Sequence, residues 1–257
     1  MSGNGAGKLS GASAWDPPPA HPVAAGAEVH VWRVSLDLPP ARAERLTRAL
    51  SDDERTRAGR FVFERDRHRF AVARGTLRAI LGRYLGVPPG NLAFAYSSHG
   101  KPALPNGAGV RDLRFNVSHA GGLALVAVAL GREVGVDIER VREDFATEEI
   151  AGRVFSPAEL AAIRVLPAAA RCAAFFNCWT RKEAYVKARG EGLSLPLHRF
   201  DVSVAPGEPA ALLATAENSC EASRWSLREL QPGPGYVASL AVEGHSWRPR
   251  CWQWPEE

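Results

Sequence analysis

Two carboxylates stand two residues apart in residues 135–139, Gly-Val-Asp-Ile-Glu. Side chains alternate between the two faces of a strand, so Asp137 and Glu139 would share one face, with Cα atoms about 6.5 Å apart. Val136 and Ile138 would point the other way, into a core. Carboxylates this close repel each other unless a cation or a proton lies between them, and oxygen ligands suit Mg²⁺. The spacing indicates a metal site, although a strand with a solvated acidic face would show the same pattern.

A second group of charged residues, 179–187, has helical spacing. At about 100° per residue, Trp179, Lys182, Glu183 and Lys187 lie within one arc of about 140°. The arc sets a carboxylate between two ammonium groups, beside an indole. In the functional interpretation, Glu183 binds the metal ion, and both lysines bind negatively charged phosphate groups. The alternative is a surface helix with an ion pair between Glu183 and Lys187.

A third segment, residues 115–119, reads Phe-Asn-Val-Ser-His and precedes a turn at Gly121-Gly122. Ser118 and His119 would end a strand there, where a hydroxyl and an imidazole can meet an anion. Adjacent Ser and His suggest a hydrolase as well. That interpretation is weak, because no G-x-S-x-G elbow is present and neighbours on a strand face opposite sides.

Together, these three segments resemble the 4′-phosphopantetheinyl transferases, of the long, pseudo-dimeric type typified by the surfactin-synthetase-activating enzyme. That family carries (F/Y)-N-(I/V)-S-H, then G-(I/V)-D-(I/V)-E, then W-x-x-K-E-(A/S)-(Y/F)-x-K, and this chain has all three without a gap or a substitution. Weaker family features are Gly100-Lys101-Pro102 and the segments 155–159 and 190–194. The resemblance covers about residues 29 to 245.

The resemblance implies the reaction. The phosphopantetheine arm of coenzyme A, the substrate, would pass to a serine of an apo acyl, peptidyl or aryl carrier protein, and 3′,5′-ADP would leave. Asp137, Glu139 and Glu183 would bind Mg²⁺, with Mn²⁺ as the other candidate ion. The implied catalytic residues are Glu183, Lys187 and Glu159, of which Glu159 is either a structural helix cap or a base acting through water.

The implied coenzyme A ligands come from both halves of the chain. Lys101, Ser118 and His119 would hold the end that carries the adenosine 3′-phosphate, and Lys182 and Lys187 would contact the pyrophosphate and the arm. Three arginines complete the set: Arg55, Arg57 and Arg69. The sequence departs from the family at Glu54, where the type enzyme has a lysine that Arg55 would replace. It also departs at Phe70, where a small hydroxyl residue is common.

The predicted elements occur twice in the same order. Alternating strand patterns begin at Val29 and at Val134, and capping boxes begin at Ser51 and at Ser156, an offset of 105 residues in both cases. Helices ending near 86 and 190 and hairpins at 113–130 and 225–242 follow the same order. We expect an internal duplication. The fold would be α+β, with two similar halves, each a small antiparallel sheet packed against helices, arranged as a pseudo-dimer.

The expected boundaries are a disordered tail at 1–27, a first half at 28–132, a second half at 133–245 and a C-terminal tail at 246–257. The first half would contribute to coenzyme A binding, and the second would hold the metal site and the helix with the W-x-x-K-E-A motif. Asp137 and Glu139 align with Trp32 and Val34, while Lys182 and Glu183 fall opposite apolar or neutral positions. A single site is therefore expected.

The net charge of +4 is concentrated, because residues 41 to 83 hold twelve arginines against six acids. Such a stretch suits a phosphorylated ligand or an acidic carrier protein. We expect no nucleic-acid partner, because no aromatic stacking block or binding motif accompanies the arginines. The remaining alternative is a non-catalytic coenzyme A-binding protein on the same fold, although a protein that only binds has no need of three metal-binding acids.

The chain shows no feature of secretion or membrane insertion. Its longest apolar run, residues 123–130, is shorter than the roughly 20 residues that span a bilayer, and no apolar signal segment follows Met1. The four cysteines form no C-x-x-C pair, which favours reduced thiols. We expect a cytoplasmic protein with no membrane partner, acting as a monomer with an internal pseudo-two-fold axis.

Overall fold

The structure is a computed structural model, and it describes residues 15–97, 100–105, 112–216, 218 and 220–255. Residues 1–14 of the predicted tail lie outside this range. The rest of that tail lies against the folded chain. The Trp15 indole donates a hydrogen bond of 2.7 Å to the Gln231 carbonyl, and Asp16 forms a parallel bridge with Trp252.

The first half is a sheet with helices on one face. Its hairpin turns at Gly121, whose φ of 54° favours glycine. The sheet order is β11-β1-β5-β4, in which β11 (Arg248–Gln253) comes from the end of the described chain. The elements are β1 (Glu28–Ser35), α1 (Pro40–Thr47), α2 (Asp52–Gly59), α3 (Glu64–Leu85), the 3-10 turn η1 (Pro89–Asn91), β2 (Ala95–Tyr96), β3 (Pro102–Ala103), β4 (Leu113–Ala120) and β5 (Leu123–Leu130).

The second half has a smaller sheet of order β6-β10-β9 and a two-stranded sheet of β7 and β8. Its elements are β6 (Val134–Arg140), α4 (Glu148–Val154), α5 (Pro157–Arg164), α6 (Ala168–Arg189), η2 (Gly192–Ser194), η3 (Leu197–Arg199), β7 (Phe200–Val202), β8 (Leu212–Thr215), η4 (Ala222–Arg224), β9 (Trp225–Leu230) and β10 (Tyr236–Glu243).

Two predicted strands are shorter than the sequence suggested. The segment 92–96 contributes only the two residues of β2. In the segment 197–204, the 3-10 turn η3 follows Pro196 and leaves three residues for β7. Proline fixes its own φ near the helical value and has no N–H for a ladder, so the strand begins only after the turn.

The predicted duplication agrees with the element pattern. α3 and α6 are both 22 residues long and both end at a left-handed glycine, Gly86 and Gly190. Capping boxes begin α2 at Ser51 and α5 at Ser156. The two halves therefore have the expected α+β architecture.

Each capping-box glutamate also makes a buried ion pair with the long helix of its own half. Glu54 accepts from Arg78 Nε at 2.6 Å, and Glu159 Oε1 lies 2.8 Å from Lys182 Nζ. Both cations also donate to carbonyl groups after the helix, at Leu92 and at Phe200. Arg78 is thus the counterpart of Lys182, so the expectation of an apolar or neutral residue opposite Lys182 is wrong.

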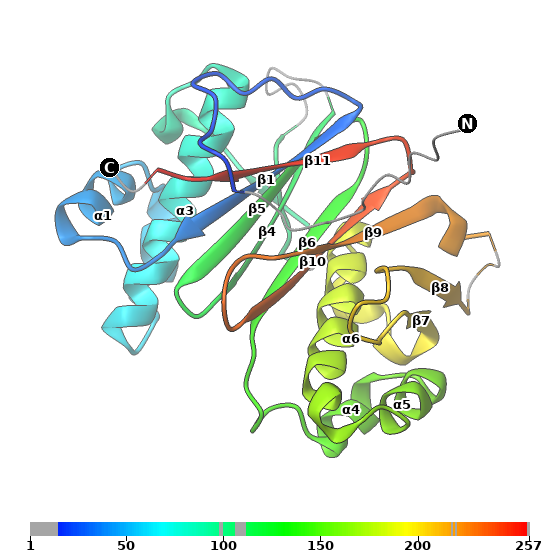
Figure 1. Ribbon diagram of the computed structural model, residues 1–257. Coiled ribbons are helices and arrows are strands. Elements are labelled where there is room, and N and C mark those ends of the chain that lie inside the picture. Colours follow the sequence, from blue (N-terminus) through cyan, green and yellow to red (C-terminus); the bar gives the residue numbers. More distant parts are fainter. Residues whose placement is uncertain (1–14, 98–99, 106–111, 217, 219, 256–257) are drawn as a thin grey trace, which may run out of the picture.

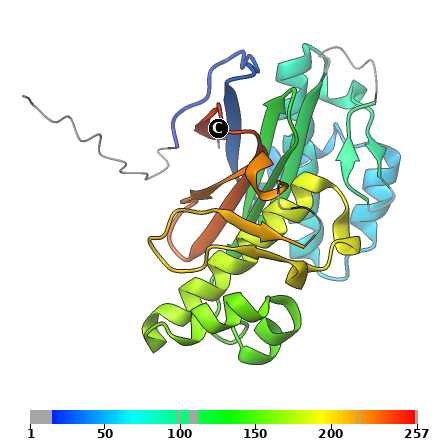
Figure 2. The same ribbon diagram turned by 90° about the vertical axis from the view of Figure 1, so that its right-hand side faces the viewer.

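The two sheets share an apolar core. On β1, Val29 and Val31 face the second sheet, while Trp32 faces the core under α3. On β6, Val136 and Ile138 belong to the same intersheet core, as predicted for that face. Figure 1 shows the sheets in the middle, with α3 and α6 on opposite sides. Figure 2 shows α4 and α5 packed near one end of α6.

The segment 246–257, predicted as a tail, contains β11, which returns to the first half. β11 pairs in parallel with β1, from Glu28 opposite Arg248 to Arg33 opposite Gln253. The red strand therefore lies beside the blue one in Figure 1. Within the described residues, none of the helices has both the length and the apolar character that crossing a membrane requires.

Candidate active site

Gly135 brings the helix α6 directly onto strand β6. A Cβ atom at Gly135 would lie 2.1 Å from the Ala184 carbonyl oxygen and 2.3 Å from the Ala188 nitrogen. Only glycine permits this contact between a helix backbone and a strand backbone. The close approach sets Glu183 and Lys187 on α6 beside the acids of β6.

Asp137 is the most enclosed acid of the site, with 3% of its surface exposed. Its Oδ1 accepts hydrogen bonds from Ser118 Oγ at 2.9 Å and from Lys187 Nζ at 2.5 Å. Lys187 Nζ also donates to Ser118 Oγ at 2.9 Å. Asp137 Oδ2 is buried and has no hydrogen-bond partner in the described structure. One carboxylate oxygen is therefore satisfied, and the other is left without a hydrogen-bond partner among the described residues.

The other two predicted acids are half-buried and repelled by Asp137. Desolvation, the largest cause, and the charge of Asp137 raise the pKa of Glu139 to about 7, although Lys187 and a hydrogen bond with Trp179 oppose the shift. The pKa of Glu183 is also raised, first by desolvation and then by Asp137. The three carboxylates therefore share one electrostatic environment. Within the described chain, however, no three His, Cys, Asp or Glu side chains form a group that could hold a metal ion.

Strand β4 is joined to β6 by side chains rather than by a backbone ladder. Asn116 Oδ1 accepts from the Val136 N–H at 2.9 Å, and Ser118 Oγ accepts from the Ile138 N–H at 3.4 Å. Both side chains lie on one face of β4, because they are two residues apart. Asn116 and Gly135 were missing from the predicted site residues, although both belong to the recognised motifs.

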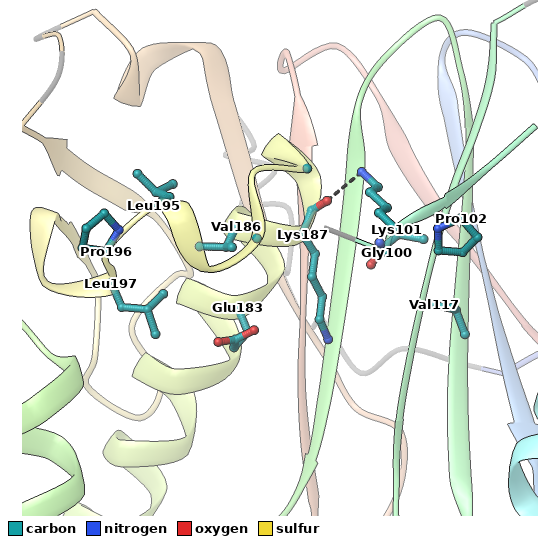
Figure 3. Close-up of a pocket in the computed structure, with 13 residues that line it drawn as sticks. Gly100, Lys101, Pro102, Val117, Glu183, Val186, Lys187, Leu195, Pro196 and Leu197 are labelled. Carbon is teal, nitrogen blue, oxygen red and sulfur yellow. Dashed lines mark hydrogen bonds between the residues drawn. The ribbon is translucent and has the colours of Figure 1, made fainter. Parts of the chain in front are cut away.

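A pocket of about 410 Å³ lies between the halves, next to these groups. Glu183 and Lys187 line it together with apolar side chains of the second half, Val186, Leu195 and Leu197. Figure 3 shows Leu197 and Glu183 on one side of this region and Lys101 on the other. The pocket thus joins an apolar wall to the charged cluster.

Lys101 reaches the pocket from the first half and holds the end of α6. Its ammonium donates to the Lys187 carbonyl at 2.7 Å and to the Ala188 carbonyl at 3.3 Å, and the first of these bonds is drawn in Figure 3. Burial lowers the pKa of Lys101, while Glu133 opposes the shift. A cation at a helix C-terminus satisfies carbonyl groups that lack intrahelical partners.

Lys182 and Glu159 are buried and are not among the residues that line the pocket. Lys182 is 0% exposed, and its ammonium donates to the Leu197 carbonyl at 2.7 Å besides its contact with Glu159. The Glu159 carboxylate also accepts from the N–H groups of Ser156 and Val202, both at 2.8 Å. Both charged groups are therefore fully engaged inside the second half.

Of the three predicted arginines of the first half, Arg55 and Arg57 are exposed and Arg69 is half-buried. Arg69 forms a two-bond ion pair with Asp37, with both bonds 2.7 Å long. Arg55 lies 3.6 Å from Asp52. Arg57 stands 5.5 Å over the Phe70 ring.

His119 lies at the end of β4, beside the charged cluster. Its pKa lies below its ordinary value, because of desolvation first and then the positive charges of Lys187 and Arg57. The charge of Arg57 therefore contributes to the electrostatics of the site.

Two family models cover most of the chain. One, described as the 4′-phosphopantetheinyl transferase superfamily, matches residues 133–241. The other, described as the N-terminal part of a 4′-phosphopantetheinyl transferase, matches residues 39–130. The chain is also 42% identical to the 4′-phosphopantetheinyl transferase HetI of Nostoc sp., over 93% of this chain and 98% of that protein.

The chain belongs to the 4′-phosphopantetheinyl transferase superfamily. Two further transferases of this superfamily come from Bacillus subtilis. One is 32% identical over 67% of this chain and 75% of its own length. The other, Sfp, is 27% identical over 82% of this chain and 91% of its own length. The predicted family and enzyme class are confirmed, and coenzyme A is the substrate that the superfamily uses.

Proposed function

We propose that this enzyme transfers the phosphopantetheine arm of coenzyme A to a serine of an apo carrier protein, with Mg²⁺, releasing 3′,5′-ADP. The serine oxygen would bond to the phosphorus that carries the arm, and the bond from that phosphorus to the bridging oxygen would break. The pair of electrons and the negative charge leave with 3′,5′-ADP. The relatives named as phosphopantetheinyl transferases support the transfer itself.

The buried Asp137 Oδ2, which lacks a hydrogen-bond partner, carries the metal part of the proposal. Glu139 and Glu183 supply further oxygen donors. Burial is the main cause of their raised pKa values, and the charge of Asp137 adds to the shift by a repulsion that a cation would relieve. Mg²⁺ is commonly held by one or two carboxylates together with waters and substrate phosphates, so a preformed three-ligand group is not required. When bound, the ion would offset the charge that builds on the leaving phosphate.

Lys187 and Glu183 are the protein groups that we assign to the chemistry. Lys187 Nζ is held at the site by Ser118 and Asp137, where its charge can bind the pyrophosphate. Glu183 lines the pocket, and it is the carboxylate that we assign to take the serine proton, directly or through water. For Glu159 and Lys182 we favour a structural role, because their hydrogen-bonding capacity is used inside the protein.

Coenzyme A contacts follow from the same arrangement. We assign Ser118, His119 and Lys187 to the phosphates near the site, and the exposed Arg57 to the 3′-phosphate. Arg55 and Arg69 are secondary candidates, since each already lies near an aspartate. Lys101 would act mainly through the α6 terminus that it caps.

Replacement of Asp137 tests the proposal. Asp137→Ala should lower the transfer rate at saturating Mg²⁺ by at least about 10²–10³-fold, because the site loses its most enclosed carboxylate. Intact-mass spectrometry of a panel of apo carriers should show the gain of about 340 Da with wild-type enzyme and not with the variant. Circular dichroism would verify that the fold survives, and Glu44→Ala, an exposed acid on α1, is the control.

Two outcomes would change the assignment. Wild-type turnover in the Asp137 variant would remove the metal role of this residue. Tight coenzyme A binding by the wild-type protein with no transfer to any carrier would favour the non-catalytic coenzyme A-binding alternative.

A further inference from the structure

The connection between α2 and α3 exposes two neighbouring apolar side chains. Val62 is 86% exposed and Phe63 is 68% exposed. In the part of the chain that the structure describes, they are the only sequence neighbours among the exposed large hydrophobic residues. Scattered single residues of this kind are common on protein surfaces, but a paired patch with a charged rim is typical of an interaction site. We call residues 57–67 the α2–α3 tip.

Positive charge without a carboxylate partner surrounds this pair. Residues 55–69 hold six arginines against two acids, a surplus as large as the net charge of the whole chain. Within the described residues, Arg57, Arg60 and Arg67 lie in no ion pair. Arg67 donates to the Phe61 carbonyl at 3.3 Å, and Arg57 stands over the Phe70 ring. A partner for this surface should carry negative charge around an apolar centre.

Arg57, at the start of the tip, acts on the candidate active site through its charge. The Phe61 ring packs on Phe70 with ring centroids 5.2 Å apart, which ties the tip to the first turns of α3. Arg57 contacts the same Phe70 ring, and its positive charge, like that of Lys187, lowers the pKa of His119. A protein that presents a serine to the site beside His119 would therefore lie close to the α2–α3 tip.

We propose that the α2–α3 tip docks the apo carrier protein, through an acidic carrier surface with an apolar patch at its centre. Val62 and Phe63 would be buried at the middle of the interface, and Arg60 and Arg67 would form its rim. Such apolar centres carry most of the binding energy of protein interfaces, while rim charges mainly increase the association rate. The inference rests on the proposed transfer to carrier proteins and names the surface that serves it.

The first experiment replaces the apolar pair. The substrate is an apo carrier that the wild-type enzyme modifies. For this carrier, the double variant Val62→Ser, Phe63→Ser should raise the KM by about 10–100-fold and leave the KM for coenzyme A unchanged. The matched control is Val165→Ser with Leu213→Ser, two residues that are 83% and 57% exposed in the second half. An unchanged carrier KM in the tip variant, or an increase in the coenzyme A KM instead, would overturn the proposal.

The second experiment tests the charge of the rim. Arg60→Glu should lower kcat/KM for the carrier at low salt and flatten its decline with rising salt, because exposed charges are screened by added ions. Arg228→Glu makes the same charge change at an exposed arginine of the second half and should have a smaller effect. Equal effects of the two variants would mean that net charge, rather than the tip, guides the encounter.

Two further results separate the possible failures. Sedimentation of wild-type protein with anionic lipid vesicles, lost in the Val62–Phe63 double variant, would assign the tip to a lipid surface and overturn carrier docking. If wild-type protein modifies no carrier, the proposed function and this inference fail together. If wild-type protein modifies carriers and the tip variants match their controls, only this inference fails.

Discussion

Lys182 and Glu183 are neighbours on α6 with opposite environments. Lys182 is fully enclosed and meets Glu159, whereas Glu183 lines the pocket. Adjacent residues on a helix differ by about 100° in direction, so one can face the interior while the next faces a cleft. The same motif therefore supplies a buried anchor for the helix and a carboxylate that lines the pocket.

Glu159→Gln tests the role of this anchor. Breaking a buried ion pair leaves an uncompensated charge, here on Lys182, so the variant should lose about 3–5 kcal/mol of unfolding free energy in urea titrations. Adding Lys182→Met should recover part of the loss, because the unpaired charge is removed. A stable Glu159→Gln protein without transferase activity would instead identify Glu159 as the base.

The buried His30 should make the stability of the fold depend on pH. Its imidazole hydrogen-bonds Tyr84 Oη at 2.7 Å, packs on Trp252 and lies 3.4 Å from Glu28. Burial lowers the pKa of His30 below its ordinary value of 6.5 and Arg250 adds to this, although Glu28 opposes the shift. The unfolded chain therefore takes up a proton at a higher pH than the folded chain does.

The stability that depends on neutral His30 should be complete above pH 6.5. It should be lost as the pH falls through the folded-state pKa, since protons then favour the unfolded chain. Chemical denaturation between pH 8 and pH 5 should show the decline, and His30→Gln should make it shallower. An identical pH slope in the variant would assign the decline to other groups.

Strand β6 and helix α6 act as one unit because of Gly135. The helix backbone occupies the space that any side chain at this position would need. This explains in physical terms why a glycine precedes the two acids in the motif. The strand supplies Asp137 and Glu139, and the helix can reach them only at this separation.

Gly135→Ala should push α6 away from β6. Overpacking a close contact typically costs about 1–3 kcal/mol of unfolding free energy. Transferase activity should also fall at temperatures where the variant is still folded, because Lys187 and Glu183 move with the helix. Gly152→Ala in α4 is the control. A Cβ there would meet nothing within 4 Å, and alanine in a helix should stabilise the protein by up to about 1 kcal/mol. Equal melting temperatures for the two variants would contradict the packing argument.

The last strand connects the two halves of the molecule. After β10 of the second half, β11 returns to pair with β1 of the first. Trp252 packs edge-on against Trp32, with ring centroids 4.9 Å apart, and Trp254 lies near the same ring at 5.8 Å. The chain end thus covers a sheet edge and completes the core under α3.

Trp254→Ala should lower the unfolding free energy by about 3–5 kcal/mol, because the 6%-exposed indole leaves a cavity in the first-half core. Unfolding followed by fluorescence and by circular dichroism would measure the loss. Deletion of residues 246–257 should be more damaging and yield aggregation-prone protein, because the edge of β1 becomes exposed. A truncated chain with wild-type stability would show that β11 is dispensable.

The order of elements, the duplication, the alternating faces of β6 and the family could all be predicted from the sequence. They depend on local periodicity and short spacings, as with Asp137 and Glu139 on one strand face. The tertiary structure alone decided which charged side chains reach the pocket. Lys182 and Glu159 are buried while Lys187 meets Asp137, because packing of α6 on Gly135 sets the rotation of the helix. The pairing of β11 with β1 could not be predicted from the sequence either, because a parallel pairing between distant segments of the chain leaves no local pattern.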